Sequence, residues 1–276
     1  MEEIIKAIVF GIVQGATEFI PISSTAHLRI VPALLGWKDE GAAFTAVIQL
    51  GTLLATFIYF RTDIKNLWKG FLQAFKNKDF FSNPESRIFL LIIIGTIPIC
   101  IFGLLLKDFI EGDARGLYVI SASLIILAII LYIAEKVGTR TKDMKDITIK
   151  DGIVIGLAQA LALIPGSSRS GVTITAGLFR GLRRDVCARY SFLLSIPAIT
   201  LSGLYELYSE RATLLDSNLT SLIIATIVSG IVGYASIKFL LHYLRTHSNM
   251  VFIIYRIVLG IIIILLVSNG VLSNLD

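Results

Sequence analysis

Residues 14–28 read QGATEFIPISSTAHL and lie between two of the most apolar parts of the chain. The stretch combines a carboxylate, three hydroxyls and an imidazole, which belong to Glu18, Ser23, Ser24, Thr25 and His27. Irregular backbone at membrane depth is tolerated only where it is buried in protein or lines a wet cavity. The stretch therefore predicts a polar site within a membrane protein.

The composition of the whole chain supports a membrane protein. Of its 276 residues 55% are hydrophobic and 16% are charged, whereas soluble domains carry about 25% charged residues. The mean hydropathy is +0.80. The apolar runs that approach the roughly 20 residues needed to cross a bilayer are 44–60, 88–106, 117–134, 187–205, 219–240 and 250–267. We therefore expect an all-α polytopic membrane protein.

The positive charge lies between these runs. The net charge of +5 would suggest nucleic acid only if the location of the charge were ignored. Lys and Arg concentrate in residues 61–87, 136–150, 180–189 and 238–245, whereas 107–116 and 206–218 have few. The positive-inside rule places the four basic segments in the cytoplasm. We expect a membrane as partner, no nucleic acid, and both termini outside.

This topology requires re-entrant segments. Residues 136–150 and 180–189 are predicted on the same side, so 152–179 must enter and leave there. It is too short for two full spans at 1.5 Å per residue, but it suits a helical hairpin. Residues 4–36 are predicted to form a second hairpin that enters from outside.

The two hairpins resemble each other in sequence. Residues 11–15 read GIVQG and residues 152–156 read GIVIG, and the loops PISSTAH and PGSSRSG follow them. Three spans follow each hairpin, and an odd number of crossings separates the two units. We predict a single membrane domain, 1–276, in which repeat 1–135 is followed by an inverted repeat, 151–270. Such repeats place the site where their broken helices meet.

The second loop, PGSSRSGVT at 165–173, has the composition of an anion site. Arg169 offers a planar fork that matches phosphate oxygens, and the N-terminus of a following helix would add its dipole. The alternative is a hydroxyl-rich turn with Arg169 extended to the interface. Because an ionisable residue at membrane depth is costly, we favour anion binding.

The first loop adds groups that could perform chemistry. Gln14 and Glu18 are four residues apart and share a helix face. Glu18 could be a metal ligand, a general base or an interface carboxylate. His27 could reach Ser24 if the loop folds back, which is the pairing of an activated nucleophile. Arg256 in the last span is expected to face the bundle interior, paired with a carboxylate. Together the two loops hold the groups that phosphoryl transfer needs.

These two motifs resemble those of the bacterial undecaprenyl-diphosphate phosphatases, the family linked to bacitracin resistance. The first motif is matched by Gln14, Glu18, Ser23, Ser24, Thr25 and His27. The second is matched by Pro165, Gly166, Ser168, Arg169, Ser170 and Thr173. The likeness extends to IGTIPI at 94–99 and RYSFLLSIPA at 189–198.

The resemblance implies hydrolysis of undecaprenyl diphosphate to undecaprenyl phosphate and inorganic phosphate, which recycles a lipid carrier for peptidoglycan synthesis. It implies a Mg²⁺- or Ca²⁺-dependent site in the inner membrane, open to the outer side. Catalytic roles fall to Glu18, Ser24, His27 and Arg169, with Glu18 as metal ligand. Substrate-binding roles fall to Gln14, Ser23, Thr25, Gly166, Ser168, Ser170 and Thr173. Many members have Glu where this chain has Gln14, so metal binding would rest on Glu18 and the substrate's diphosphate.

Two questions stay open at the level of sequence. Ser24 could attack the terminal phosphorus while His27 takes or relays its proton, or water could attack with His27 or Glu18 as base. A transporter or flippase for a phosphorylated lipid or another anion is the alternative function, because inverted repeats with broken helices are its plan. The oligomeric state is also open, with a homodimer as one candidate.

Overall fold

The computed structural model describes residues 2–38, 40–210 and 219–274, and helices dominate throughout this part of the chain. The helices long and apolar enough to cross a membrane are α5 (Pro84–Leu105), α7 (Leu117–Val137), α10 (Arg184–Ser209), α12 (Leu219–Tyr243) and α13 (Met250–Ser268). A sixth candidate span joins α3 (Gly41–Tyr59) to α4 (Arg61–Asn77) across a bend of 72°. The predicted all-α polytopic membrane protein is confirmed.

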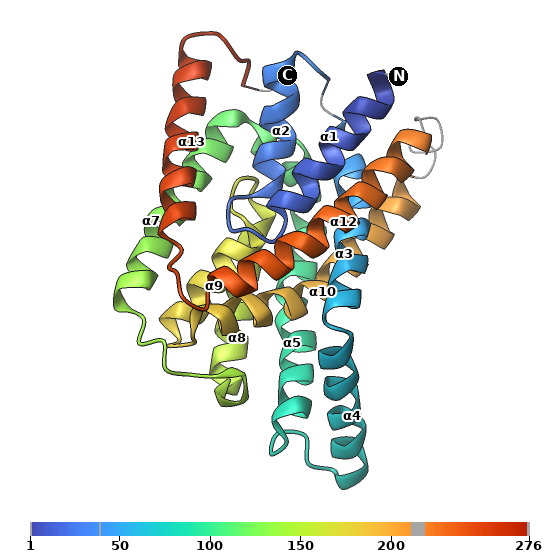
Figure 1. Ribbon diagram of the computed structural model, residues 1–276, viewed down its shortest axis with the longest axis vertical. Coiled ribbons are helices and arrows are strands. Elements are labelled where there is room, and N and C mark those ends of the chain that lie inside the picture. The colour runs from blue at the N-terminus through green and yellow to red at the C-terminus, as the bar shows by residue number, and fades with distance from the viewer. Residues whose placement is uncertain (1, 39, 211–218, 275–276) are drawn as a thin grey trace.

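Two helical hairpins complete the bundle and enter it from opposite ends (Figure 1). The first consists of α1 (Glu2–Thr17) and α2 (Ser24–Leu35). The second consists of α8 (Ile149–Gln159), the 3₁₀ turn η3 (Ala160–Leu163) and α9 (Arg169–Phe179). These bounds agree with the predicted hairpins 4–36 and 152–179. Their loops therefore approach each other from the two ends of the bundle.

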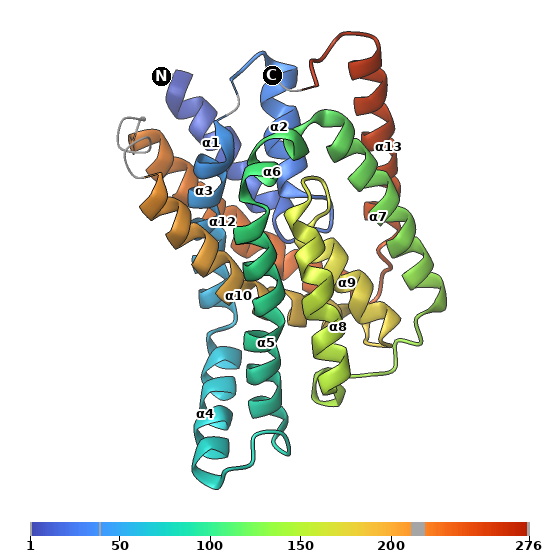
Figure 2. The same ribbon diagram turned by 180° about the vertical axis from the view of Figure 1, so that it is seen from behind.

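The connections are arranged as the charge pattern predicts. The segments that join α3 to α5 and α7 to α8 lie toward one end of the bundle, and both termini lie toward the other (Figure 1). Figure 2 shows α6 (Lys107–Glu111), in the connection from α5 to α7, near the end that holds the termini. Residues 211–218 of the predicted loop 206–218 lie outside the described residues.

One basic segment contains a helix that the apolar runs did not predict. The first part of 61–87, which we predicted to be cytoplasmic, forms the helix α4. The buried residues of α4 are Leu67, Gly70 and Ala74, which recur at helical spacing and form the face that packs on α5. Its lysines lie on the exposed side. The short apolar stripe is too narrow to stand out in a search for long apolar runs.

The helix pairings of the two halves are reciprocal. Helix α1 of the first hairpin packs on α12, and α8 of the second hairpin packs on α5. The glycines of GIVQG and GIVIG mediate these contacts: Gly15 faces the backbone of Ser229, and Gly156 faces that of Gly95. Small residues let helix backbones approach closely in a membrane. This reciprocity supports the predicted inverted repeat, which stays a prediction.

The contact between Gly156 and Gly95 leaves no room for a side chain. A Cβ atom at Gly156 would lie 2.4 Å from the Cα atom of Gly95. We therefore expect Gly156→Ala to destabilise the protein by about 1–3 kcal/mol, as overpacking does. The thermal midpoint in detergent is the measurement. Gly103→Ala on α5 is the control, because its new methyl group would meet only Leu163, at 3.6 Å; equal midpoints for the two variants would contradict the prediction.

Candidate active site

A cavity of about 550 Å³ lies where the two hairpin loops meet. Of the predicted site residues, five line it: Glu18, Ser24, Thr25, Ser168 and Arg169. Apolar side chains of α5 and α10 line it further along, among them Ile99, Leu104 and Ile199. The cavity therefore joins a polar region to an apolar wall.

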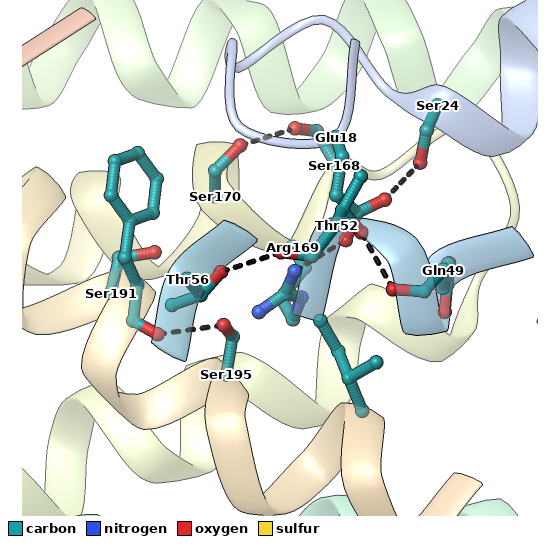
Figure 3. A network of polar contacts seen from close by, with 12 residues as sticks. Glu18, Ser24, Gln49, Thr52, Thr56, Ser168, Arg169, Ser170, Ser191 and Ser195 are labelled. Atoms are coloured by element: carbon teal, nitrogen blue, oxygen red, sulfur yellow. Dashed lines mark hydrogen bonds and ion pairs between the residues drawn. The ribbon is translucent and has the colours of Figure 1, made fainter. Parts of the chain in front are cut away.

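Glu18 is the centre of the polar region (Figure 3). Its Oε2 atom accepts hydrogen bonds from the amide of Gln14 at 2.9 Å and from the hydroxyl of Ser24 at 2.8 Å. Its Oε1 atom pairs with the guanidinium of Arg169, which comes from the other hairpin. Glu18 is 6% exposed. One buried carboxylate thus connects the two motifs.

Both loops end in a serine that caps the following helix and adopts the same unusual backbone conformation. Ser23 and Ser168 cap α2 and α9, and their side chains accept from the backbone N–H groups of Ala26 and Gly171. Both have positive φ angles, 76° and 65°. Non-glycine residues rarely adopt this conformation, which costs on the order of 1–3 kcal/mol. The turn places Ser24 and Arg169 at the first positions of their helices.

The other predicted substrate-binding residues lie behind the cavity lining. Gln14 and Ser170 are buried, and the hydroxyl of Ser170 lies 3.2 Å from that of Ser168. Thr173 bonds to Ser191 of α10, with 2.6 Å between the two oxygens. Gly166 has a φ of 89°, and a Cβ there would lie 2.5 Å from the carbonyl oxygen of Ile120. In this structure these residues contact protein groups and support the loops.

His27 has different partners from the one suggested by the sequence. Its Nδ1 atom lies 2.7 Å from the carbonyl oxygen of Ser23, and its Nε2 atom lies 2.7 Å from the hydroxyl of Tyr255. The hydroxyl of Ser24 instead donates to Glu18. In this arrangement Glu18, rather than His27, is in hydrogen-bonding contact with Ser24.

Arg256 faces the bundle interior, as expected, and is fully buried. The partners of its Nη2 atom are backbone carbonyls rather than the expected carboxylate. The Nη2 atom donates to Ser167 at 3.0 Å, to Ser123 at 3.3 Å and to Gly166 at 3.4 Å. Arg256 therefore fastens the start of the second loop to α7 and α13. A carbonyl-rich turn is an acceptor surface that the sequence does not reveal.

The helix α3 contributes polar residues that were not predicted from the sequence. Thr45 and Gln49 line the cavity, and Thr52 and Thr56 follow them on the same helix. Figure 3 shows Gln49, Thr52 and Thr56 near Glu18 and Arg169, with the hydroxyls of Thr52 and Thr56 bonded to backbone carbonyls of α3 itself. These four residues recur at spacings of four, three and four, which is one helix face. That polar stripe within the apolar run 44–60 was the signal that could have revealed them.

The fold and the cavity define the class of this protein. It is an integral membrane protein with a charged site between two broken helical hairpins. The family model described as bacitracin resistance protein BacA matches residues 7–262. The chain belongs to this family.

Relatives from several bacteria match almost the whole chain. A protein of Prosthecochloris aestuarii is 54% identical over 274 residues, which cover 96% of this chain and 97% of the relative. One from Chlorobium phaeobacteroides is 53% identical, covering 97% and 98%. One from Myxococcus xanthus is 50% identical, covering 99% and 92%. Each of these proteins is named undecaprenyl-diphosphatase.

Proposed function

We infer that this protein is a membrane phosphatase that hydrolyses undecaprenyl diphosphate to undecaprenyl phosphate and inorganic phosphate, which recycles a lipid carrier for cell-wall synthesis. The contact that carries this inference is the one between Glu18, Ser24 and Arg169, because it joins a proton acceptor, a hydroxyl and a phosphate-binding guanidinium. Membership of the family and the names of the relatives support the same activity.

The shape of the cavity suits an amphipathic substrate. The diphosphate would lie beside Arg169 and the hydroxyls of Ser24, Thr25 and Ser168, since Arg binds phosphate oxygens bidentately. The first part of the prenyl chain would follow the apolar side chains of α5 and α10. A volume of about 550 Å³ holds a headgroup and the beginning of a chain, so the rest of the chain would lie in the lipid.

The contacts suggest how the reaction proceeds. The substrate's phosphates compete with Glu18 for the guanidinium of Arg169. The Oγ atom of Ser24 attacks the terminal phosphorus while its proton passes to Glu18, and the anhydride P–O bond breaks to release undecaprenyl phosphate. The proton on Glu18 passes to solvent as undecaprenyl phosphate departs. Water then attacks the phosphoserine and gives a proton to Glu18, and this proton returns to the Oγ atom of Ser24 as the Oγ–P bond breaks to release phosphate. Arg169 stabilises the charge that develops on the phosphoryl oxygens.

The residues present also fit a divalent cation. Glu18 offers a carboxylate, and the Oε1 atom of Gln14 is buried with no hydrogen-bond partner among the described residues. Mg²⁺ and Ca²⁺ prefer such oxygen ligands, and Mg²⁺ is often bound through one or two carboxylates together with substrate phosphates. Within the part of the chain that the structure describes, no group of three His, Cys, Asp or Glu residues gathers. Glu18 and Gln14 would therefore hold the cation with the diphosphate, and the cation would neutralise phosphate charge.

We also propose that the active site faces the outer side of the inner membrane. Lys107, Ile110 and Arg115, which line the cavity, belong to the connection between α5 and α7. This connection lies toward the end that holds the termini and away from the basic α4 (Figure 2). The positive-inside rule assigns that end to the outside.

Phosphate release from undecaprenyl diphosphate by the purified protein tests this function. We expect release that stops in EDTA and recovers with Mg²⁺ or Ca²⁺. Arg169→Ala should lower release by about 100-fold to 1,000-fold, the range seen when one donor to a developing anion is removed. Arg183→Ala is the control, because Arg183 is half-exposed and pairs with Asp143 and Asp185.

Other outcomes separate the proposals. No release from folded protein would overturn the phosphatase and leave transport of the lipid as the function to test. Release at the full rate in EDTA would overturn the cation proposal alone. If Arg183→Ala lowered phosphate release as much as Arg169→Ala, the proposed role of Arg169 in binding phosphate would be wrong.

A further inference from the structure

Tyr255 of α13, which belongs to neither motif, contacts the first motif. Its hydroxyl oxygen lies 2.7 Å from the Nε2 atom of His27. The two rings are stacked, with centroids 5.6 Å apart and an interplanar angle of 9°. The residues are 228 positions apart in the sequence. The last helix of the chain thus reaches the first loop.

The hydrogen bonds of His27 define which nitrogen carries the proton. The carbonyl oxygen of Ser23, which lies 2.7 Å from Nδ1, can only accept a hydrogen bond. Nδ1 of the neutral ring must therefore be protonated, and Nε2 must present its lone pair to the hydroxyl of Tyr255. Tyr255 donates this bond and so fixes the tautomer of His27, in the way that a second partner commonly orients a histidine.

The same chain of contacts supports the turn before Ser24. Ser23 holds a φ of 76° and a ψ of 102°, and its carbonyl accepts from both the ring and the backbone N–H of His27. Because Ser23 immediately precedes Ser24, the orientation of this turn sets the direction of the Ser24 hydroxyl toward Glu18. A bond from Tyr255 to His27 therefore acts on the reacting hydroxyl through two residues.

We propose that Tyr255 is a positioning residue for hydrolysis, which holds the His27 ring so that the Ser23 turn directs Ser24 at Glu18. The proposal rests on the proposed phosphatase function. It gives His27 an orienting role and leaves proton transfer to Glu18. It also accounts for the Tyr255 hydroxyl in a helix whose other polar side chains are Arg256 and Ser268.

Tyr255→Phe tests this proposal because it keeps the ring and removes the hydroxyl. We expect kcat to fall by about tenfold to 100-fold, the scale on which small misplacements of reacting groups act, while KM changes less than about twofold. Tyr132→Phe on α7 is the matched control, since the ring of Tyr132 lies beside Lys136 rather than the site. An unchanged kcat in Tyr255→Phe would overturn the proposal.

Nitrogen NMR of ¹⁵N-histidine gives a readout that does not depend on activity. The chain has three histidines, so His242→Gln with His247→Gln leaves His27 as the single signal. We expect a Nδ1–H tautomer in this background and a downfield shift of Nε2 when Tyr255→Phe is added. An unmoved Nε2 resonance would overturn the contact itself. If the wild type released no phosphate, the proposed function would fail while this spectrum still reported the contact.

A purely structural role of Tyr255 predicts a different pattern. It would lower the thermal midpoint and the yield of folded protein, and would leave kcat per folded molecule unchanged. Titrating active protein by bound substrate analogue separates the two cases. A fall in the midpoint with an unaltered kcat would therefore also overturn the positioning role.

Discussion

Glu18→Gln is expected to lower phosphate release by about 1,000-fold or more. Glutamine keeps the size of the side chain and its oxygen, but it carries no charge and cannot accept the proton of Ser24. General-base catalysis contributes about 100-fold to 10,000-fold, and the loss of the charge also leaves Arg169 without its counter-ion. The rate of release under saturating substrate is the measurement.

The ion pair between Glu18 and Arg169 allows a second test with a double variant. Glu18 and Arg169 act as a pair across the two loops, so Glu18→Gln with Arg169→Ala should be about as slow as the slower single variant, because residues that work as a unit are not additive. Glu85→Gln at the exposed start of α5 is the control. Retention of more than a tenth of the activity in Glu18→Gln would exclude the carboxylate as base.

The membrane architecture could be predicted because long apolar runs are a strong signal. The run 117–134 became α7, and 250–267 became α13, with ends that differ by a few residues. The second hairpin followed from charge and length, since the basic segments on each side of 152–179 place both of its ends on one side of the membrane. The helix α4 was not predicted, because its apolar face is narrow and its lysines resemble those of a loop.

The candidate site could be predicted in its composition but not in its contacts. Glu18 and Arg169 were expected in one site because inverted repeats bring their broken helices together, and the structure places them in contact. The partners of His27 could not be predicted, since they depend on the positive φ of Ser23 and on Tyr255 more than two hundred residues away. The partners of Arg256 could not be predicted either, because they are backbone carbonyls and every residue of the sequence has one.

Ser24→Ala distinguishes the two chemical routes that the sequence left open. If Ser24 is the nucleophile, its loss should lower release by about 1,000-fold or more, since nucleophile removal eliminates the covalent path. If water attacks directly, Ser24 only binds a phosphate oxygen, and the loss should be about tenfold, as for one hydrogen bond to a charged group. Ser268→Ala is the control, because that serine is exposed at the end of α13.

The contact between Ser24 and Glu18 favours the covalent route, and a trapped intermediate would establish it. The hydroxyl donates to the carboxylate at 2.8 Å, so the proton has an acceptor at the moment of attack. Acid-quenched wild-type enzyme should then carry phosphoserine at Ser24 by mass spectrometry, and Ser24→Ala should carry none. A tenfold loss without any phosphoserine would instead assign the attack to water, with Glu18 as its base and Ser24 as a ligand of the phosphate.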